Sequence, residues 1–184
     1  MTTEAKPEYS PGLAGVIAGE TSICWVDPNA GLMYRGYDIH DMGNKATFEE
    51  VAYLLLNGEL PNAKQLKEFK GQIAAERNLP KEVVEMLHLL PKKTHPMDML
   101  RTGVSMLSAF DKDLGDNSHD ANIRKSIKLI ARVETLITDG WRIGKGQKPL
   151  PEKPELGQAA NFFYKLDGKV PEDWKTRMMD TIFN

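Results

Sequence analysis

The sequence predicts a mainly α-helical protein with a small β-hairpin near its N-terminus. Three observations support this fold class. Apolar residues recur three and four positions apart over most of the chain after Thr47. Eleven prolines divide the chain into short blocks of helical length. Only residues 21–37 combine apolar, partly β-branched runs with a cluster of turn residues, which is typical of paired strands.

The composition limits the kind of protein this is. The chain has 184 residues, 41% of them hydrophobic, which is enough for one domain with a buried core. A net charge of −2 gives no reason to expect nucleic acid or an anionic membrane as a partner. A single cysteine excludes an internal disulfide, so we expect a reducing, cytoplasmic location. No apolar run approaches the ~20 residues of a membrane span.

The N-terminal part is expected to contain a loose polar lead over residues 1–11 and then the hairpin. The apolar run at residues 23–26 meets a turn rich in Asp, Pro, Asn and Gly at residues 27–31. A second short run follows at residues 32–34. Cys24 lies inside the first run, so we expect a buried packing residue rather than a nucleophile.

The helical part opens with a recognisable start signal. Thr47 and Glu50, three residues apart, form a capping box, and Gly58 ends the helix that follows. Two further amphipathic helices are expected over residues 62–78 and 81–90, the first with lysines opposite its apolar face. The short linkers indicate that these helices pack within one domain.

Four more helices are expected in the second half of the chain. A polar loop and a break rich in Gly, Pro and Lys separate them. In the last helix Trp174, Met178 and Ile182 recur four apart and form an apolar stripe that needs a partner. The expected helices cover residues 97–110, 123–143, 155–166 and 171–184, with the loop at 111–122 and the break at 144–154.

The four histidines are the first candidates for chemistry. His40 stands between acids, which could raise its pKa and suit a proton shuttle, but we favour a solvated loop residue. His88 lies between leucines with no second ligand at metal-pair spacing, which favours core or boundary packing. His95 precedes a proline and is expected to cap a helix. His119 has two aspartates nearby but lacks the spacing of a Ca²⁺ loop, so we favour a polar surface loop.

Two basic positions are the next candidates. Arg35 lies between aromatic residues and could stack on a neighbouring tyrosine or pair with Asp38, and we favour a structural role. Residues 144–148, "GKGQK", could cradle a phosphate with help from Arg142 and Lys145. They match no phosphate-loop pattern, so we favour a helix exit. No nucleophile–base set, carboxylate pair or metal cluster emerges, and the residues alone therefore predict neither a catalytic nor a metal site.

Four stretches together resemble the N-terminal part of citrate synthases, including the related 2-methylcitrate synthases. The most specific elements are a Tyr-Arg-Gly-Tyr turn, a Gly-Glu-Leu-Pro segment after an apolar helix, a His-Pro-Met helix entry and an Ala-Asn-Phe segment. They occur in the family's order and cover nearly the whole chain. The stretches are "GLAGVIAGETSICWVDPNAGLMYRGYDIHDM" (12–42), "TFEEVAYLLLNGELPNAKQLKEF" (47–69), "LPKKTHPMDMLRTGVSMLSAFD" (90–111) and "ANFFYKLDGKVPED" (160–173).

The resemblance implies that residues 12–184 form the N-terminal part of a citrate synthase-like helical large domain, in a homodimer. It also implies the tricarboxylic acid cycle reaction, in which the enol of acetyl-CoA attacks oxaloacetate and the thioester is hydrolysed. A propionyl-CoA donor is the alternative. The family's catalytic histidines and aspartate follow the segment matching residues 174–184, and none of the four histidines here matches them. The resemblance therefore assigns no catalytic residue or metal ligand, and the cofactor-binding residues are unknown.

The sequence also departs from the family pattern. Where the family has Pro-Thr with small residues, this chain has Val133-Glu134-Thr135 and then Asp139-Gly140, which weakens any coenzyme A contact inferred around Arg142. We expect the chain to be an inactive fragment of such an enzyme. The alternatives are a short non-catalytic paralogue that acts as a binding or regulatory partner and an unrelated helical interaction domain.

Overall fold

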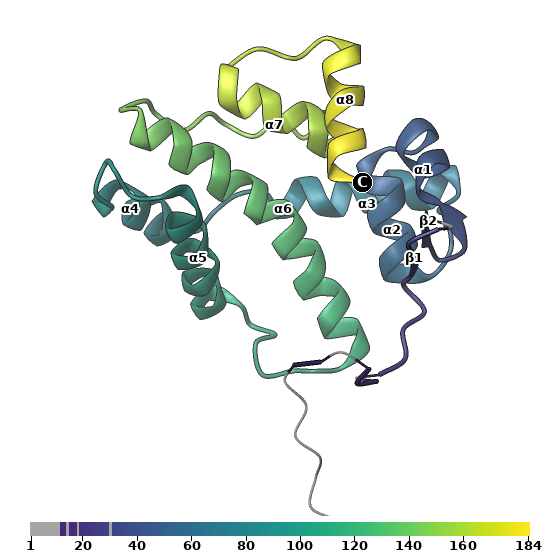
Figure 1. Ribbon diagram of the computed structural model, residues 1–184. Coiled ribbons are helices and arrows are strands. Elements are labelled where there is room, and N and C mark those ends of the chain that lie inside the picture. Colours follow the sequence, from purple (N-terminus) through teal and green to yellow (C-terminus); the bar gives the residue numbers. More distant parts are fainter. Residues whose placement is uncertain (1–11, 14, 18, 30) are drawn as a thin grey trace, which may run out of the picture.

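The computed structural model describes residues 12–184 except Ala14, Ala18 and Ala30. The predicted polar lead, residues 1–11, lies outside this part. Within it, eight α-helices and one small sheet form a mainly helical body, as the sequence predicted (Figure 1). The elements are β1 (Cys24–Asp27), β2 (Gly31–Tyr34), β3 (Tyr37–Asp38), α1 (Ile39–Lys45), α2 (Phe48–Asn57), α3 (Ala63–Glu76), α4 (Lys81–Leu89), α5 (Pro96–Leu107), α6 (His119–Gly144), α7 (Gln158–Asp167) and α8 (Asp173–Phe183).

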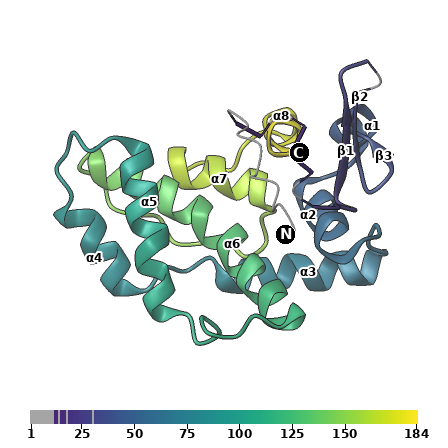
Figure 2. The ribbon, with the colours of Figure 1, turned by 60° about the horizontal axis from the view of Figure 1, so that its bottom comes forward.

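The predicted hairpin is present and carries one additional strand. β1 and β2 pair antiparallel with Trp25 opposite Met33, and β3 pairs with β2. The β2–β3 connection places Arg35 at a φ of 51°, in the left-handed region that non-glycine residues seldom occupy. The sheet projects from the edge of the helical body beside α1 and α2 (Figure 2).

Helix α6 is the central element of the fold. It packs against α3, α4, α5 and α7 (Figures 1 and 2). Its residues Ile127 and Ala131 share one apolar cluster with α2 and α3, and Leu136 joins a second cluster with α4 and α5. One long helix therefore connects these two apolar clusters, and a third cluster lies between α1 and α2.

Several helix ends lie where the sequence predicted them. The Thr47 N–H donates to Glu50 Oε2 at 2.7 Å and completes the capping box of α2. Gly58 and Gly168 end α2 and α7 in the left-handed conformation, with φ of 91° and 78°.

Three helix starts differ from the sequence prediction by two residues or more, and the short helix α1 was not predicted. Helix α8 begins at Asp173, two residues after the predicted start. Helix α6 begins at His119 rather than at Ile123, because Ser118 Oγ accepts the Ala121 N–H at 3.3 Å and provides an N-cap inside the predicted loop. Helix α7 begins at Gln158, three residues after the predicted start. No helix among the described residues has both the length and the apolar character needed to cross a bilayer.

The last helix is tied to the start of the helical body. Asp180 accepts the Phe48 N–H at 3.0 Å, at the N-terminus of α2. The Phe183 ring lies 5.5 Å from Phe48 and 5.6 Å from Phe162, in edge-to-face geometry. Arg177 donates to the carbonyls of Asn44 and Ala46. The predicted apolar stripe of α8 faces outward instead, with exposed side chains at Trp174, Met178 and Ile182.

Candidate functional site

The structure places all four histidines at exposed positions, three on different helices and one at a helix N-cap. His88 was expected in the core or at its boundary, and that prediction was wrong, because it lies on the outer side of α4. His95 caps α5 as predicted, since its Nδ1 accepts the Met97 N–H at 3.2 Å. His40 lies on α1 and His119 is the first residue of α6, so both are exposed as predicted but lie in helices rather than in loops. No two histidines come from the same element.

The two candidates on the hairpin have different outcomes. Cys24 is exposed, so the prediction of a buried residue was wrong, because the hairpin projects from the body and leaves this side chain uncovered. Arg35 has the predicted structural role. Its guanidinium donates to Ser22 Oγ at 2.5 Å and to the Leu55 carbonyl at 3.0 Å, and so fastens the hairpin to α2. Asp38, suggested as its partner, instead accepts the His40 N–H and caps α1.

The basic segment after α6 is a helix exit, as favoured from the sequence. Arg142 donates to the carbonyls of Lys148 at 2.8 Å and Leu166 at 2.9 Å, which folds the segment back toward α7. The Lys145 ammonium lies 4.6 Å from the centre of the Trp141 ring. These contacts commit Arg142 and Lys145 to the local structure.

A groove lies between α5, α6 and α7. Its volume is about 710 Å³, and apolar side chains dominate its walls. Lys92, Lys145 and Asp167 are its only charged lining residues in the described part of the chain, and the lining contains no histidine. The groove therefore has room for an apolar group but no arranged acid–base pair. The apolar walls include Met97, Met99, Leu100, Ile137, Trp141, Phe162 and Leu166.

The strongest concentration of buried charge lies between α6, α7 and residues 145–157, which connect them. The Lys165 ammonium is 2.9 Å from Asp139 Oδ1 and 2.6 Å from Glu152 Oε1, and donates to the Leu150 carbonyl. The three charged side chains are only 2%, 6% and 7% exposed. A buried ammonium with two carboxylates is costly unless each group is paired.

A buried amide extends this group of residues. Asn161 Nδ2 donates to Glu134 Oε1 at 2.9 Å and to Glu152 Oε2 at 3.0 Å. Burial raises the pKa of Glu134 to about 8, against the opposing effects of Arg77 and Asn161. Burial also raises the pKa of Asp139, although the neighbouring Lys165 acts in the opposite direction. We call Glu134, Asp139, Glu152, Asn161 and Lys165 the α6–α7 polar cluster.

A second set of buried polar contacts borders this cluster. Arg77 is 1% exposed and donates to Gln158 Oε1 and to the carbonyls of Lys153 and Leu156. The Gln158 N–H in turn donates to Glu49 Oε1 at 2.7 Å. These bonds join the ends of α3 and α7 to α2, so they hold the scaffold together.

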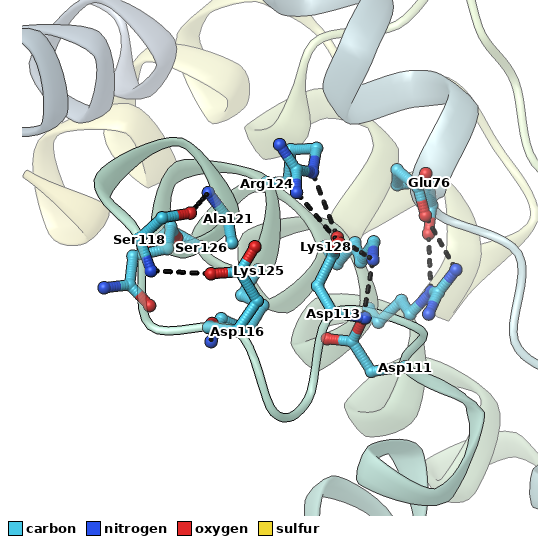
Figure 3. Close-up of polar contacts among 12 residues, drawn as sticks. Glu76, Asp111, Asp113, Asp116, Ser118, Ala121, Arg124, Lys125, Ser126 and Lys128 are labelled. Atoms are coloured by element: carbon cyan, nitrogen blue, oxygen red, sulfur yellow. Dashed lines mark hydrogen bonds and ion pairs between the residues drawn. The ribbon is translucent and has the colours of Figure 1, made fainter.

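A surface network holds the loop before α6 (Figure 3). Asp113 accepts two hydrogen bonds from Arg124, at 3.0 and 2.8 Å, and Lys128 bridges Asp111 and Asp113. Arg124 and then Lys128 lower the pKa of Asp113, and Lys128 lowers that of Asp111. Among the residues that the structure describes, no three His, Cys, Asp or Glu side chains form a group able to hold a metal ion.

The α6–α7 polar cluster was not predicted as a site from the sequence. Glu134 and Asp139 were noticed only as a departure from a family pattern. A further signal was available, since Asn161 and Lys165 lie four apart and share a helix face with Gln158. It was insufficient because that spacing suits an exposed face equally well.

Comparison with known proteins agrees with the sequence motifs and the fold. The family described as "Citrate synthase, C-terminal domain" matches residues 12–184. The chain belongs to the citrate synthase family. It is 33% identical to citrate synthase of Heyndrickxia coagulans over 94% of this chain and 47% of that protein. It is 37% identical to 2-methylcitrate synthase of Mycobacterium tuberculosis H37Rv, over 93% of this chain and 43% of the relative.

Solved structures of family members share the fold. Citrate synthase of Pyrobaculum aerophilum superposes with a TM-score of 0.87 at 29% identity, covering 99% of this chain and 50% of that one. The Thermotoga maritima enzyme gives 0.82 at 32% identity, covering 95% and 45%. The predicted citrate synthase-like helical fold is confirmed. The chain spans about half the length of these relatives.

Proposed function

We propose that residues 12–184 supply the N-terminal scaffold of the large domain in a citrate synthase-type acyltransferase. Such an enzyme condenses acetyl-CoA with oxaloacetate to citrate and CoA in the tricarboxylic acid cycle. The observation that carries this proposal is the superposition of 99% of the chain on half of a citrate synthase. Holding reactants in the correct geometry contributes to the rate, and such a scaffold would position the segments that hold them.

We also propose that the isolated chain does not catalyse the condensation. Proton abstraction from the acetyl group needs a positioned base and groups that stabilise the enolate. The four histidines are exposed, three on different helices and His95 at the N-cap of α5, and none of them lines the groove. The buried carboxyls of the α6–α7 polar cluster are likewise absent from the groove lining. These positions support a scaffold role.

The acyl donor has two candidates because relatives of both kinds are similar to this chain. Acetyl-CoA would serve a citrate synthase and propionyl-CoA a 2-methylcitrate synthase, and one Bacillus subtilis relative, 35% identical, is named for both activities. Oxaloacetate is the second substrate in either case. We propose acetyl-CoA as the leading donor.

The proposed setting is a cytoplasmic homodimer, and the alternative is a short paralogue without activity of its own. In the alternative the chain would bind a full-length enzyme. The outward stripe of α8, with Trp174 at 59% and Ile182 at 65% exposure, supports either form of association.

An assay of free thiol tests the inactivity. The purified chain is incubated with oxaloacetate and acetyl-CoA, then separately with propionyl-CoA, and full-length citrate synthase of Heyndrickxia coagulans serves as positive control. We expect thiol release at the rate of the protein-free blank, with circular dichroism showing that the chain is helical. Sustained release above the blank with either donor would refute the proposal.

A further inference from the structure

The α6–α7 polar cluster joins three separate segments of the chain. Glu134 and Asp139 come from α6, Glu152 from residues 145–157, and Asn161 and Lys165 from α7. Asn161 is the bridge, since its amide donates to carboxyls on both other segments. The contacts between these segments therefore depend on the charge state of the carboxyls.

The charges within the cluster do not balance when every carboxyl is ionised. Three carboxylates then share one ammonium, that of Lys165, and all five side chains are nearly inaccessible to water. The buried Arg77 guanidinium beside the cluster attracts Glu134 but donates its hydrogen bonds to Gln158 and to backbone carbonyls. Lys165 forms its ion pairs with Asp139 and Glu152, whereas the polar partner of Glu134 is the neutral Asn161 amide. Protonating Glu134 therefore breaks no ion pair with Lys165, whereas protonating Asp139 or Glu152 would weaken one.

The hydrogen bonding points the same way. Glu134 Oε2 and Asn161 Oδ1 are both buried acceptors without a hydrogen-bond donor. An ionised carboxylate only accepts hydrogen bonds, whereas a protonated one also donates. A proton on Glu134 therefore supplies a donor to a buried region that has surplus acceptors.

The charged groups that act on Glu134 come from three segments of the chain. They are Lys165 on α7, Glu152 on the connecting segment and Arg77 just after α3. Burial is the largest effect and raises the pKa of Glu134, and repulsion from Glu152 adds to it. Arg77, Asn161 and Lys165 lower it by smaller amounts. The group therefore holds its proton near neutral pH.

We propose that the proton on Glu134 is a latch that holds α7 and residues 145–157 against α6. Loss of the proton leaves a third buried negative charge in the cluster, beside Glu152. It also removes the hydrogen-bond donor that the protonated Glu134 carboxyl supplied. The contacts of α7 with α6 then weaken while the α2–α3 core keeps its own packing. The latch depends only on contacts within this chain and does not rest on the proposed function.

The sign of the effect follows from proton linkage. The folded pKa of Glu134, about 8, lies above the ordinary value of 4.5, so the closed state binds the proton more tightly than the open state. The Glu134 proton therefore contributes fully to the free energy of closure below pH 4.5. This contribution decreases as the pH rises and is lost above about pH 8. One proton released on opening shifts the opening equilibrium by up to about tenfold per pH unit between these limits.

Hydrogen exchange on the full chain tests the latch. Protection factors, corrected for the intrinsic exchange rate at each pH, are measured from pH 6 to 9 for amides of α7 and of α3. In wild type we expect the protection factors of α7 amides to decrease by up to about tenfold per pH unit between pH 6 and 8. This decrease should be absent in Glu134→Gln, whose side chain cannot ionise. Glu85→Gln, at an exposed position on α4, is the matched control and should follow wild type.

Two results would overturn the latch. One is an equal pH slope for α7 protection in wild type and Glu134→Gln. The other is an equal slope for α7 and α3 amides in wild type, which would mean that the proton reports unfolding of the whole chain. Glu134→Leu is the second variant if the glutamine variant does not fold. If neither variant folds, the test is the difference in pH slope between α7 and α3 amides in wild type. A steeper slope for α7 supports a local latch, and equal slopes contradict it.

Discussion

Lys165 is the buried counterion of two carboxylates at the α6–α7 interface. Its side chain is 2% exposed and its ammonium contacts Asp139, Glu152 and the Leu150 carbonyl. Removing one partner of a buried ion pair leaves an uncompensated charge, which costs far more than the pair itself contributes. The stability of this interface therefore depends on the lysine more than on either acid alone.

Replacing Lys165 by Met should lower the free energy of unfolding by about 3–5 kcal/mol, because two carboxylates lose their buried counterion. Urea denaturation followed by circular dichroism measures the change. The double variant Asp139→Leu/Lys165→Met should recover part of the loss, since it also removes one of the stranded charges.

A matched control for the lysine is Lys64→Met. Lys64 pairs with Glu68 at 3.9 Å, and both side chains are largely exposed. Exposed pairs contribute little, so this variant should stay within about 0.5 kcal/mol of wild type. A Lys165→Met variant that is equally close to wild type would show that the buried pair is not needed.

Helix packing depends on small residues at the contact between α5 and α6. A Cβ added to Gly103 would lie 2.6 Å from Leu136 Cδ2, inside the apolar cluster that α4, α5 and α6 share. Gly71 on α3, in contrast, is exposed and has no heavy atom within 4 Å of an added Cβ. The two glycines separate the effect of packing from that of helix propensity.

Gly103→Ala and Gly71→Ala should therefore change stability in opposite directions. The first is expected to lose about 1–3 kcal/mol because the interface is overpacked. The second is expected to gain about 0.5–1 kcal/mol, since alanine restricts the unfolded chain and favours helix. Thermal or urea denaturation gives both values, and a gain for both variants would mean that α5 and α6 separate at little cost.

Local signals in the sequence predicted most of the elements. The capping box at Thr47 and the glycine at Gly58 define α2 through contacts within four residues, which a sequence reader can recognise. The start of α6 was missed because Ser118 lies in a stretch as polar as any loop. The third strand was missed because two residues are too few to show a period.

Long-range contacts decided what the sequence did not predict. Cys24 and His88 stand beside apolar residues, yet neither is covered, because burial depends on which face another element occupies. In the α6–α7 polar cluster, conversely, long-range packing buries charged residues that the sequence gives no reason to place in the core. Glu134 and Lys165 are 31 positions apart, and only the packing of α7 on α6 turns two ordinary charged residues into a buried network.

At the scale of the whole molecule, the chain is a connected scaffold. Phe183 and Asp180 near one end of the sequence pack on Phe48 at the start of the helical body. Helix α6 links the apolar clusters on its two sides, and the chain superposes on about half of a citrate synthase. We propose that this scaffold holds its shape but supplies no base for enolisation.

Exchange of the acetyl-CoA methyl protons tests that claim most directly, because enolisation precedes condensation. The chain is incubated in D₂O with acetyl-CoA and oxaloacetate, and NMR follows the methyl signal and any citrate formed. We predict loss of the methyl signal at the rate of the protein-free solution and no citrate. Deuterium incorporation that is faster than the blank and proportional to the concentration of the chain would show that the chain supplies a base for enolisation and would contradict this proposal.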